Sequence, residues 1–369
     1  FERSRRALER GLNSDSSDKI LWTMLPYSYA GANKKAKALF VADKYIQLAP
    51  TEWNPYEAKG DVFLLTGEPD SAIHWWLKSR KSSSGSALRS VAYAFLLRGD
   101  YTKAIEYLRE AARKGGEIDR AWAETDTTFV YFHRGELGRA SQIINRHIVT
   151  YQKDTMLRPW LTGWMFDWVG QGDLYNYLVA LAYEKGDYKG MFRWATERAH
   201  EIIKNHRVGV EGDPTSPVQG RYEIAWALLK NGRAKESEQL MDELKNVQRP
   251  GMLVRQREYD YFVGLLAFER GEFNIAVEHF NQSFSKFPSN HAPDYHYAVA
   301  LLKTGHVQEA MQEFHRLTWW AGTGLGIVFS PTQSFWPIAA AKAHYWLGVA
   351  YEQQGKRNQA IAEYETFLD

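Results

Sequence analysis

Residues 261–280 read YFVGLLAFERGEFNIAVEHF, and residues 295–314 read YHYAVALLKTGHVQEAMQEF. The two stretches align at an offset of 34 residues, from position 261 to position 295. A glycine, a small residue and an aromatic residue agree between them, namely Gly271 with Gly305, Ala276 with Ala310 and Phe280 with Phe314. Apolar residues on each side of the glycine recur at helical spacing. The repeated pattern therefore predicts two amphipathic helices joined by a tight turn at the glycine.

Three further segments share this pattern. They are residues 58–76 (AKGDVFLLTGEPDSAIHWW), 91–108 (VAYAFLLRGDYTKAIEYL) and 346–364 (WLGVAYEQQGKRNQAIAEY). A turn of this kind favours glycine because its backbone is left-handed. The predicted turn glycines are Gly67, Gly99, Gly135, Gly186, Gly232, Gly271, Gly305 and Gly355.

The pattern resembles the tetratricopeptide repeat, a helix–turn–helix unit of 34 residues. The resemblance implies an all-α, right-handed superhelical solenoid of antiparallel helix pairs, whose first helices line a concave face. We expect one such solenoid over residues 1–369, with about nine units. Met191 and Ser237 depart from the pattern, because they stand where alanine is expected. The units are predicted to start near Lys19, Trp53, Gly85, Ala121, Gly172, Val218, Arg257, His291 and Ala341.

The period is interrupted by inserts near residues 151–170, 205–220 and 317–338. The third contains TWWAGTGLGIVFSPTQSFWP, which is uncharged and rich in aromatic residues. Its glycines lack the Lys-Ser/Thr pair of a phosphate-binding loop, and Pro331 interrupts it as a membrane span. Two interpretations remain: its aromatic side chains cover the seam between two repeats, or they flank a binding groove.

Composition excludes several classes of function. Lys and Arg total 46 against 44 Asp and Glu, and this near-balance disfavours nucleic-acid binding as the main function. There is no cysteine, so disulfides, zinc–thiolate sites and cysteine nucleophiles are excluded, and an extracytoplasmic (periplasmic or secreted) compartment is favoured. No H-E-x-x-H or G-x-S-x-G motif is present, and no run reaches the roughly 20 apolar residues of a membrane span. We therefore expect no enzyme activity, cofactor, metal or membrane span.

Aromatic residues make up 14% of the chain, and many fall on the predicted concave face. Tyr222, Tyr261, Tyr295 and Tyr345 all occupy the fifth position of their units, as a ladder of phenol rings. Such rings favour recognition of a partner, although they also pack well in a core. The candidate partner-binding residues are Tyr93, Trp122, Phe129, Tyr222, Trp226, Tyr261, Phe268, Tyr295, Trp320, Trp336 and Tyr345.

The sequence thus predicts a non-enzymatic scaffold that binds a protein or peptide partner along an aromatic concave groove. Polar residues on that face are few and scattered (Asn54, Arg89 and Asn176), so a clamp for acidic C-terminal tails is not expected. Two alternatives stay open: a polysaccharide-associated module of a bacterial envelope, and a sensor or regulatory domain of a longer protein. Replacing Tyr261 and Tyr295 together by alanine is expected to weaken binding while leaving helicity and the melting temperature nearly unchanged. A large fall in the melting temperature would show that the rings belong to the core.

Overall fold

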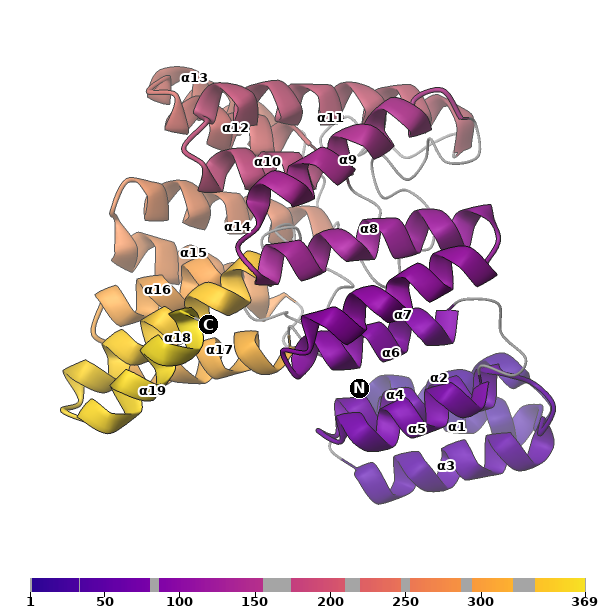
Figure 1. Ribbon diagram of the computed structural model, residues 1–369. Coiled ribbons are helices and arrows are strands. Elements are labelled where there is room, and N and C mark those ends of the chain that lie inside the picture. Colours follow the sequence, from indigo (N-terminus) through magenta and orange to yellow (C-terminus); the bar gives the residue numbers. More distant parts are fainter. Residues whose placement is uncertain are drawn as a thin grey trace. The chain divides into compact units, whose positions relative to one another are not determined.

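The computed structural model describes residues 2–32, 34–79, 86–154, 174–209, 220–246, 253–286, 294–320 and 336–368 (Figure 1). Over these ranges the chain forms 19 helices and no strand. The expected fold class, an all-α solenoid of antiparallel helix pairs, is confirmed. None of these helices is long and apolar enough to cross a lipid bilayer.

The helices form two compact units. The first unit holds the described residues up to Val130, and the second holds those from Tyr131 onwards. In the first unit each helix from α1 to α6 packs against the next along the chain, and α2 also contacts α4. Its helices are α1 (Glu2–Ser14), α2 (Lys19–Gly31), α3 (Lys35–Leu48), α4 (Asn54–Leu65), α5 (Pro69–Ser79), α6 (Ser86–Leu97), α7 (Tyr101–Lys114) and most of α8 (Glu117–His133).

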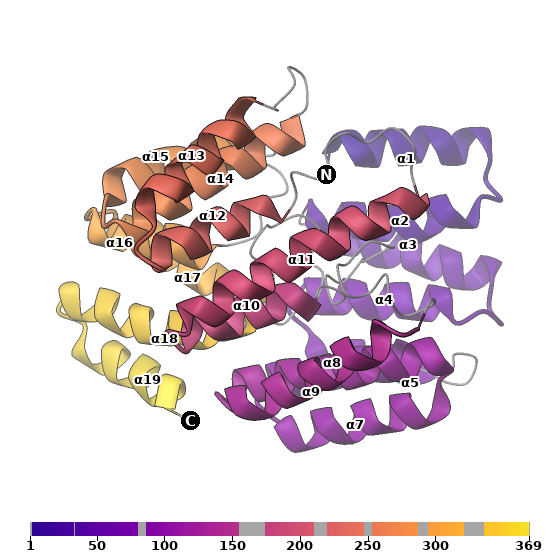
Figure 2. The same ribbon diagram turned by 90° about the horizontal axis from the view of Figure 1, so that it is seen from above.

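The second unit continues the same arrangement from α9 to α19. Each helix packs against the next, and the first helices α12, α14, α16 and α18 also contact one another in turn (Figure 2). The helices are α9 (Leu137–Tyr151), α10 (Leu174–Glu184), α11 (Tyr188–Gly209), α12 (Arg221–Lys230), α13 (Ala234–Asn246), α14 (Leu253–Glu269), α15 (Phe273–Ser285), α16 (Tyr295–Lys303), α17 (Val307–Trp320), α18 (Trp336–Gln353) and α19 (Arg357–Leu368).

The predicted repeats correspond to these helices. Each predicted start lies close to the first residue of an even-numbered helix, from α2 at Lys19 to α18 at Trp336. Helix α1 precedes the first predicted repeat and has no counterpart in the repeat pattern. Most of the three predicted inserts lies outside the described residues, which include only their edges in α9, α11, α17 and α18.

The turns between paired helices confirm the glycine prediction. All eight predicted turn glycines have a positive φ, between 65° and 86°. At Gly271 (φ 76°) the following residue, Glu272, donates its backbone N–H to Ala267 O at 2.9 Å, which caps the end of α14. A side chain at this position would strain the backbone, and glycine avoids that cost.

Small residues let the two helices of a pair approach closely. A Cβ added to Gly60 would lie 2.4 Å from Trp76 of the paired helix, far inside contact distance. Met191 and Ser237, which depart from the repeat pattern, are nevertheless fully buried, and Ser237 Oγ donates to Ala225 O at 2.7 Å. The expected alanines are buried as well: Ala72, Ala104, Ala140, Ala276, Ala310 and Ala360.

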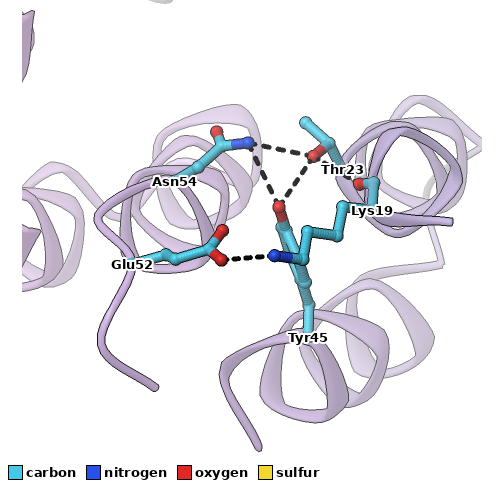
Figure 3. Close-up of polar contacts among 5 residues, drawn as sticks. All are labelled: Lys19, Thr23, Tyr45, Glu52 and Asn54. Atoms are coloured by element: carbon cyan, nitrogen blue, oxygen red, sulfur yellow. Dashed lines mark hydrogen bonds and ion pairs between the residues drawn. The ribbon is translucent and has the colours of Figure 1, made fainter. Parts of the chain in front are cut away.

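Polar side chains connect the helices of the first unit. Asn54 Nδ2 donates to Thr23 Oγ1 at 3.1 Å and to the Tyr45 hydroxyl at 3.2 Å, so it joins α4 to α2 and α3 (Figure 3). An exposed ion pair between Lys19 and Glu52 lies beside this cluster (Figure 3). Asn54 therefore has partners on two neighbouring helices of the same unit.

A second polar cluster in the first unit is centred on Asp61. Its carboxylate accepts from the Tyr27 hydroxyl at 2.6 Å and from Trp76 Nε1 at 2.9 Å. Burial disfavours the charged form and raises the pKa of Asp61 to about 6, although both hydrogen bonds act in the opposite direction. In the unfolded chain the pKa is near 4. The folded state therefore binds the proton more tightly than the unfolded state.

We expect Asp61 to make the first unit less stable as the pH rises from about 4 to about 6, by roughly 2–3 kcal/mol in the free energy of unfolding. Asp61→Asn keeps the volume and can bond both Trp76 and Tyr27. It should therefore be more stable than wild type at pH 8 and equal to it near pH 4. Urea unfolding of both proteins across this range measures the difference. Parallel pH profiles for the two proteins would show that folding does not raise the pKa of Asp61.

Candidate binding face of the second unit

The first helices of the second unit bring aromatic rings together around His296 at the start of α16. Measured between ring centroids, His296 lies 5.1 Å from Phe268, 5.3 Å from Tyr295, 6.1 Å from Trp226 and 6.4 Å from Tyr183. The rings meet at interplanar angles of 71° to 87°, which is the edge-to-face geometry that aromatic pairs prefer. We call these five residues the inner cluster. It joins α10, α12, α14 and α16.

One carboxylate, that of Glu269 on α14, organises the polar side of the inner cluster. It accepts from Trp226 Nε1 at 2.9 Å and from Lys230 Nζ at 2.6 Å. The Tyr183 hydroxyl also hydrogen-bonds Glu269, and burial together with this carboxylate raises the pKa of Tyr183 well above its usual range. Burial lowers the pKa of His296, and Asp294 opposes this only in part, so His296 is uncharged at neutral pH.

Lysine side chains lie over the rings at the edge of the inner cluster. Lys230 Nζ is 5.3 Å from the ring centroid of Tyr183, and Lys342 Nζ of α18 is 5.5 Å from that of Tyr295. Lys342 also forms an ion pair with Glu184 of α10, a residue 158 positions earlier in the chain. This ion pair connects the α10 and α18 ends of the series of first helices.

Helix α18 adds two more rings beside the inner cluster. Trp346 Nε1 donates to the Tyr295 hydroxyl at 2.9 Å, and Lys303 Nζ lies 5.2 Å from the Trp346 ring. Tyr345 is 42% exposed and meets Trp346 edge-on at 5.4 Å. Tyr295, Tyr345, Trp346, Lys303 and Lys342 together form what we call the outer rim. No group of three or more potential metal ligands occurs in the described parts of the chain.

Family comparisons agree with this architecture. Two family profiles, both described as tetratricopeptide repeat, match the chain: one matches residues 57–117 and 264–318, and the other residues 341–369. The matched segments of the chain are tetratricopeptide repeats. No curated protein matches this repeat protein.

Several solved structures are similar to it at low identity. A Rap protein complexed with competence and sporulation factor is 11% identical, with 95% of this chain and 96% of that chain covered and a TM-score of 0.46. A tetratricopeptide repeat protein from Parabacteroides merdae is 11% identical, with 77% and 94% covered and a TM-score of 0.43. A chain of the APC/C hetero-tetramer Cut9-Hcn1 is 14% identical, with 81% and 51% covered and a TM-score of 0.41. The repeat protein thus spans about half of that last chain.

The tyrosine ladder predicted for the repeat protein does not form one continuous surface. Tyr222 and Tyr261 are only 2% and 1% exposed. Tyr222 stacks on Phe262 at 5.0 Å, and the Tyr261 hydroxyl donates to the buried carboxylate of Asp294 at 2.6 Å. Tyr261→Ala would therefore lower the melting temperature, which corrects the expectation that this substitution spares stability.

The other candidates in the second unit differ in exposure. Trp226 is fully buried, and Phe268 is half-buried in the inner cluster. Tyr295 is half-buried and Tyr345 exposed, and both belong to the outer rim. Trp320 ends α17 and Trp336 begins α18, and their side chains lie outside the described part of the structure.

The three candidates in the first unit surround a buried ion pair between α6 and α8. Arg89 Nε donates to Asp126 Oδ2 at 2.6 Å, and the Tyr93 hydroxyl donates to Asp126 Oδ1 at 3.0 Å. The Arg89 guanidinium lies 4.7 Å from the Trp122 ring centroid, and Phe129 is 6.3 Å from Tyr93. Tyr93, Trp122 and Phe129 are thus brought together, with Phe129 buried and the other two half-buried.

The charged residues of the face were not predicted, although the sequence contains a signal for them. The residue two positions before the turn glycine is charged in four successive first helices, and its sign alternates. These residues are Glu184, Lys230, Glu269 and Lys303. Because the first helices lie next to one another, equivalent positions of opposite charge can pair, as Lys230 and Glu269 do.

Proposed function

We propose that this tetratricopeptide-repeat scaffold binds an extended or helical segment of a partner protein on the outer rim of its second unit. The observation that carries the proposal is the combination of exposed Tyr345 with half-buried Tyr295 and Trp346 on two adjacent first helices. Tyrosine and tryptophan provide a large, rigid contact area with a polar tip, and they dominate the energetics of many interfaces.

The inner cluster holds the rings of the outer rim in position. The Tyr295 hydroxyl holds the Trp346 indole at 2.9 Å, and Tyr295 in turn packs against buried His296. Fixed rings lose less conformational freedom on binding than mobile ones, so a rigid base favours affinity. In this account Trp226 and Tyr261 act by holding the helices in place and do not touch the partner.

The proposal is tested by affinity capture from an extract of the source organism, with wild type, Tyr345→Ala and the control Phe40→Ala as baits. Phe40 is 62% exposed and lies on α3 of the first unit, so it matches the loss of an exposed ring elsewhere. We expect a protein that is retained by wild type and by Phe40→Ala, and whose affinity for Tyr345→Ala is about tenfold weaker. Circular dichroism should show equal helicity for the three baits.

Two results would contradict the proposal. A protein partner retained equally by all three baits would place binding outside the rim. Capture of a glycan in place of a protein, with the same dependence on Tyr345, would favour the polysaccharide alternative. Mass spectrometry of both eluted proteins and eluted glycans distinguishes these results.

A further inference from the structure

Two lysine side chains of the first unit converge on the ring of Trp75 in α5. Lys59 Nζ from α4 lies 3.8 Å from the ring centroid, and Lys78 Nζ lies 4.1 Å from it. Tyr56 stacks on the same indole at 6.3 Å with an interplanar angle of 25°. The two distances from lysine Nζ to the ring centroid fall well within the range of cation–π attraction. We call Tyr56, Lys59, Trp75 and Lys78 the lysine–tryptophan patch.

The patch carries more positive than negative charge. Lys59 is only 8% exposed and forms an ion pair with Asp43 of α3. Lys78 is exposed and has no ion pair among the described residues. Because both ammonium groups lie about 4 Å from one centroid, they are within about 8 Å of each other. Asp43 balances the charge of Lys59, so the ammonium group of Lys78 is the unbalanced charge of the patch.

An anionic group placed beside the exposed Lys78 would balance this charge, and the surroundings indicate the chemical class of the anion. Trp75 and Tyr56 are half-buried, and Trp53 at the start of α4 is 39% exposed. An anion that docks here therefore meets apolar ring surface next to the charge. A polypeptide with an acidic residue beside an aromatic or aliphatic one supplies both features.

We propose that the lysine–tryptophan patch is a docking site for an acidic side chain of a partner polypeptide, with a neighbouring apolar side chain lying against Tyr56 and Trp53. The carboxylate would pair with the exposed ammonium group of Lys78 beside the Trp75 ring. This site belongs to the first unit and is distinct from the outer rim of the second unit. Its failure would leave the function proposed for the rim untouched.

The test uses a displayed library of random peptides and the full chain. Peptides that bind the Lys78→Glu variant are first removed, and those that still bind wild type are then recovered. Lys78 is exposed, so the variant should keep the fold, which circular dichroism checks. Lys103→Glu is the matched control. Lys103 Nζ also lies over an aromatic ring, 5.2 Å from the centroid of Phe95, but it forms an ion pair with Asp100 at 3.2 Å.

We expect the recovered peptides to contain Asp or Glu beside Phe, Trp or Leu. For a synthetic peptide of this set, Kd should rise about tenfold or more with Lys78→Glu or when the acidic residue of the peptide becomes its amide. Lys103→Glu should change it less than about twofold.

Three outcomes would overturn the proposal. The first is a recovered set without acidic residues, and the second is a set of acidic peptides whose affinity does not depend on Lys78. The third is wild-type binding to phosphatidylserine vesicles that Lys78→Glu abolishes, without selection of any acidic peptide. That result would assign the patch to an anionic lipid surface.

Discussion

Replacing Trp226 by alanine is expected to reduce the free energy of unfolding of the second unit by about 3–5 kcal/mol. Trp226 is fully buried, its ring lies 4.7 Å from that of Tyr183, and its indole N–H donates to Glu269. The substitution would remove this packing and leave a cavity at the centre of the inner cluster. Urea unfolding followed by circular dichroism measures the loss.

A second variant separates packing from hydrogen bonding at this site. Trp226→Phe retains much of the ring but loses the N–H donor, while Glu269 still accepts from Lys230. We expect a loss of about 1–2 kcal/mol for this variant. If Trp226→Ala unfolded at the same urea concentration as wild type, the ring would have to be a surface group, and the original prediction of a partner-binding Trp226 would be restored.

The second large effect is expected at the buried ion pair of the first unit. Arg89→Met should reduce the free energy of unfolding by about 3–5 kcal/mol, because it leaves a buried carboxylate without its guanidinium. The Asp126 side chain is 1% exposed, and burial raises its pKa even with Arg89 present. The loss should shrink as the pH falls, since protonated Asp126 needs no cation.

A double substitution tests whether the charge itself causes this loss. Arg89→Met/Asp126→Leu removes both charges and keeps an apolar volume, so it should recover most of the lost stability. Denaturant unfolding of wild type, Arg89→Met, Asp126→Leu and the double variant completes the double-mutant cycle. Equal losses for Arg89→Met and for the double variant would show that packing of the arginine stem, and not its charge, matters here.

Much of the fold could be predicted from the sequence because a few positions allow only one kind of residue. The turn glycines adopt a left-handed backbone, and Gly60 faces a tryptophan ring with no room for a Cβ. Such constraints are local and recur in every repeat, so their spacing identifies the helix pairs. Helix α1 was not predicted, because it lies before the first repeat and does not carry the repeat pattern.

The candidate site was harder to predict, because the exposure of a ring depends on its neighbours in space. Tyr261 and Tyr345 occupy equivalent positions in their repeats, yet they are 1% and 42% exposed. Tyr261 contacts Phe280 of α15 and bonds Asp294, whereas Tyr345 contacts Tyr364 and Phe367 of α19. Helical spacing assigns both residues to one face but does not show which of them neighbouring side chains cover.

The pairing of charged residues between helices cannot be recognised from any single repeat. Glu269 gains its partner from α12, and Lys342 gains its partner from α10. Each pair joins residues far apart in the sequence, so only alignment of the repeats at the turn glycine would have suggested the first, and nothing local suggests the second.

Amide hydrogen exchange of the repeat protein, with and without the partner captured through Tyr345, tests binding on the outer rim directly. We expect slower exchange in α16 and at the Tyr345–Trp346 turn of α18 when the partner is bound, with little change in α3 and α7. Slower exchange confined to the first unit, or no change in α16 and α18 at saturating partner, would contradict binding on the outer rim.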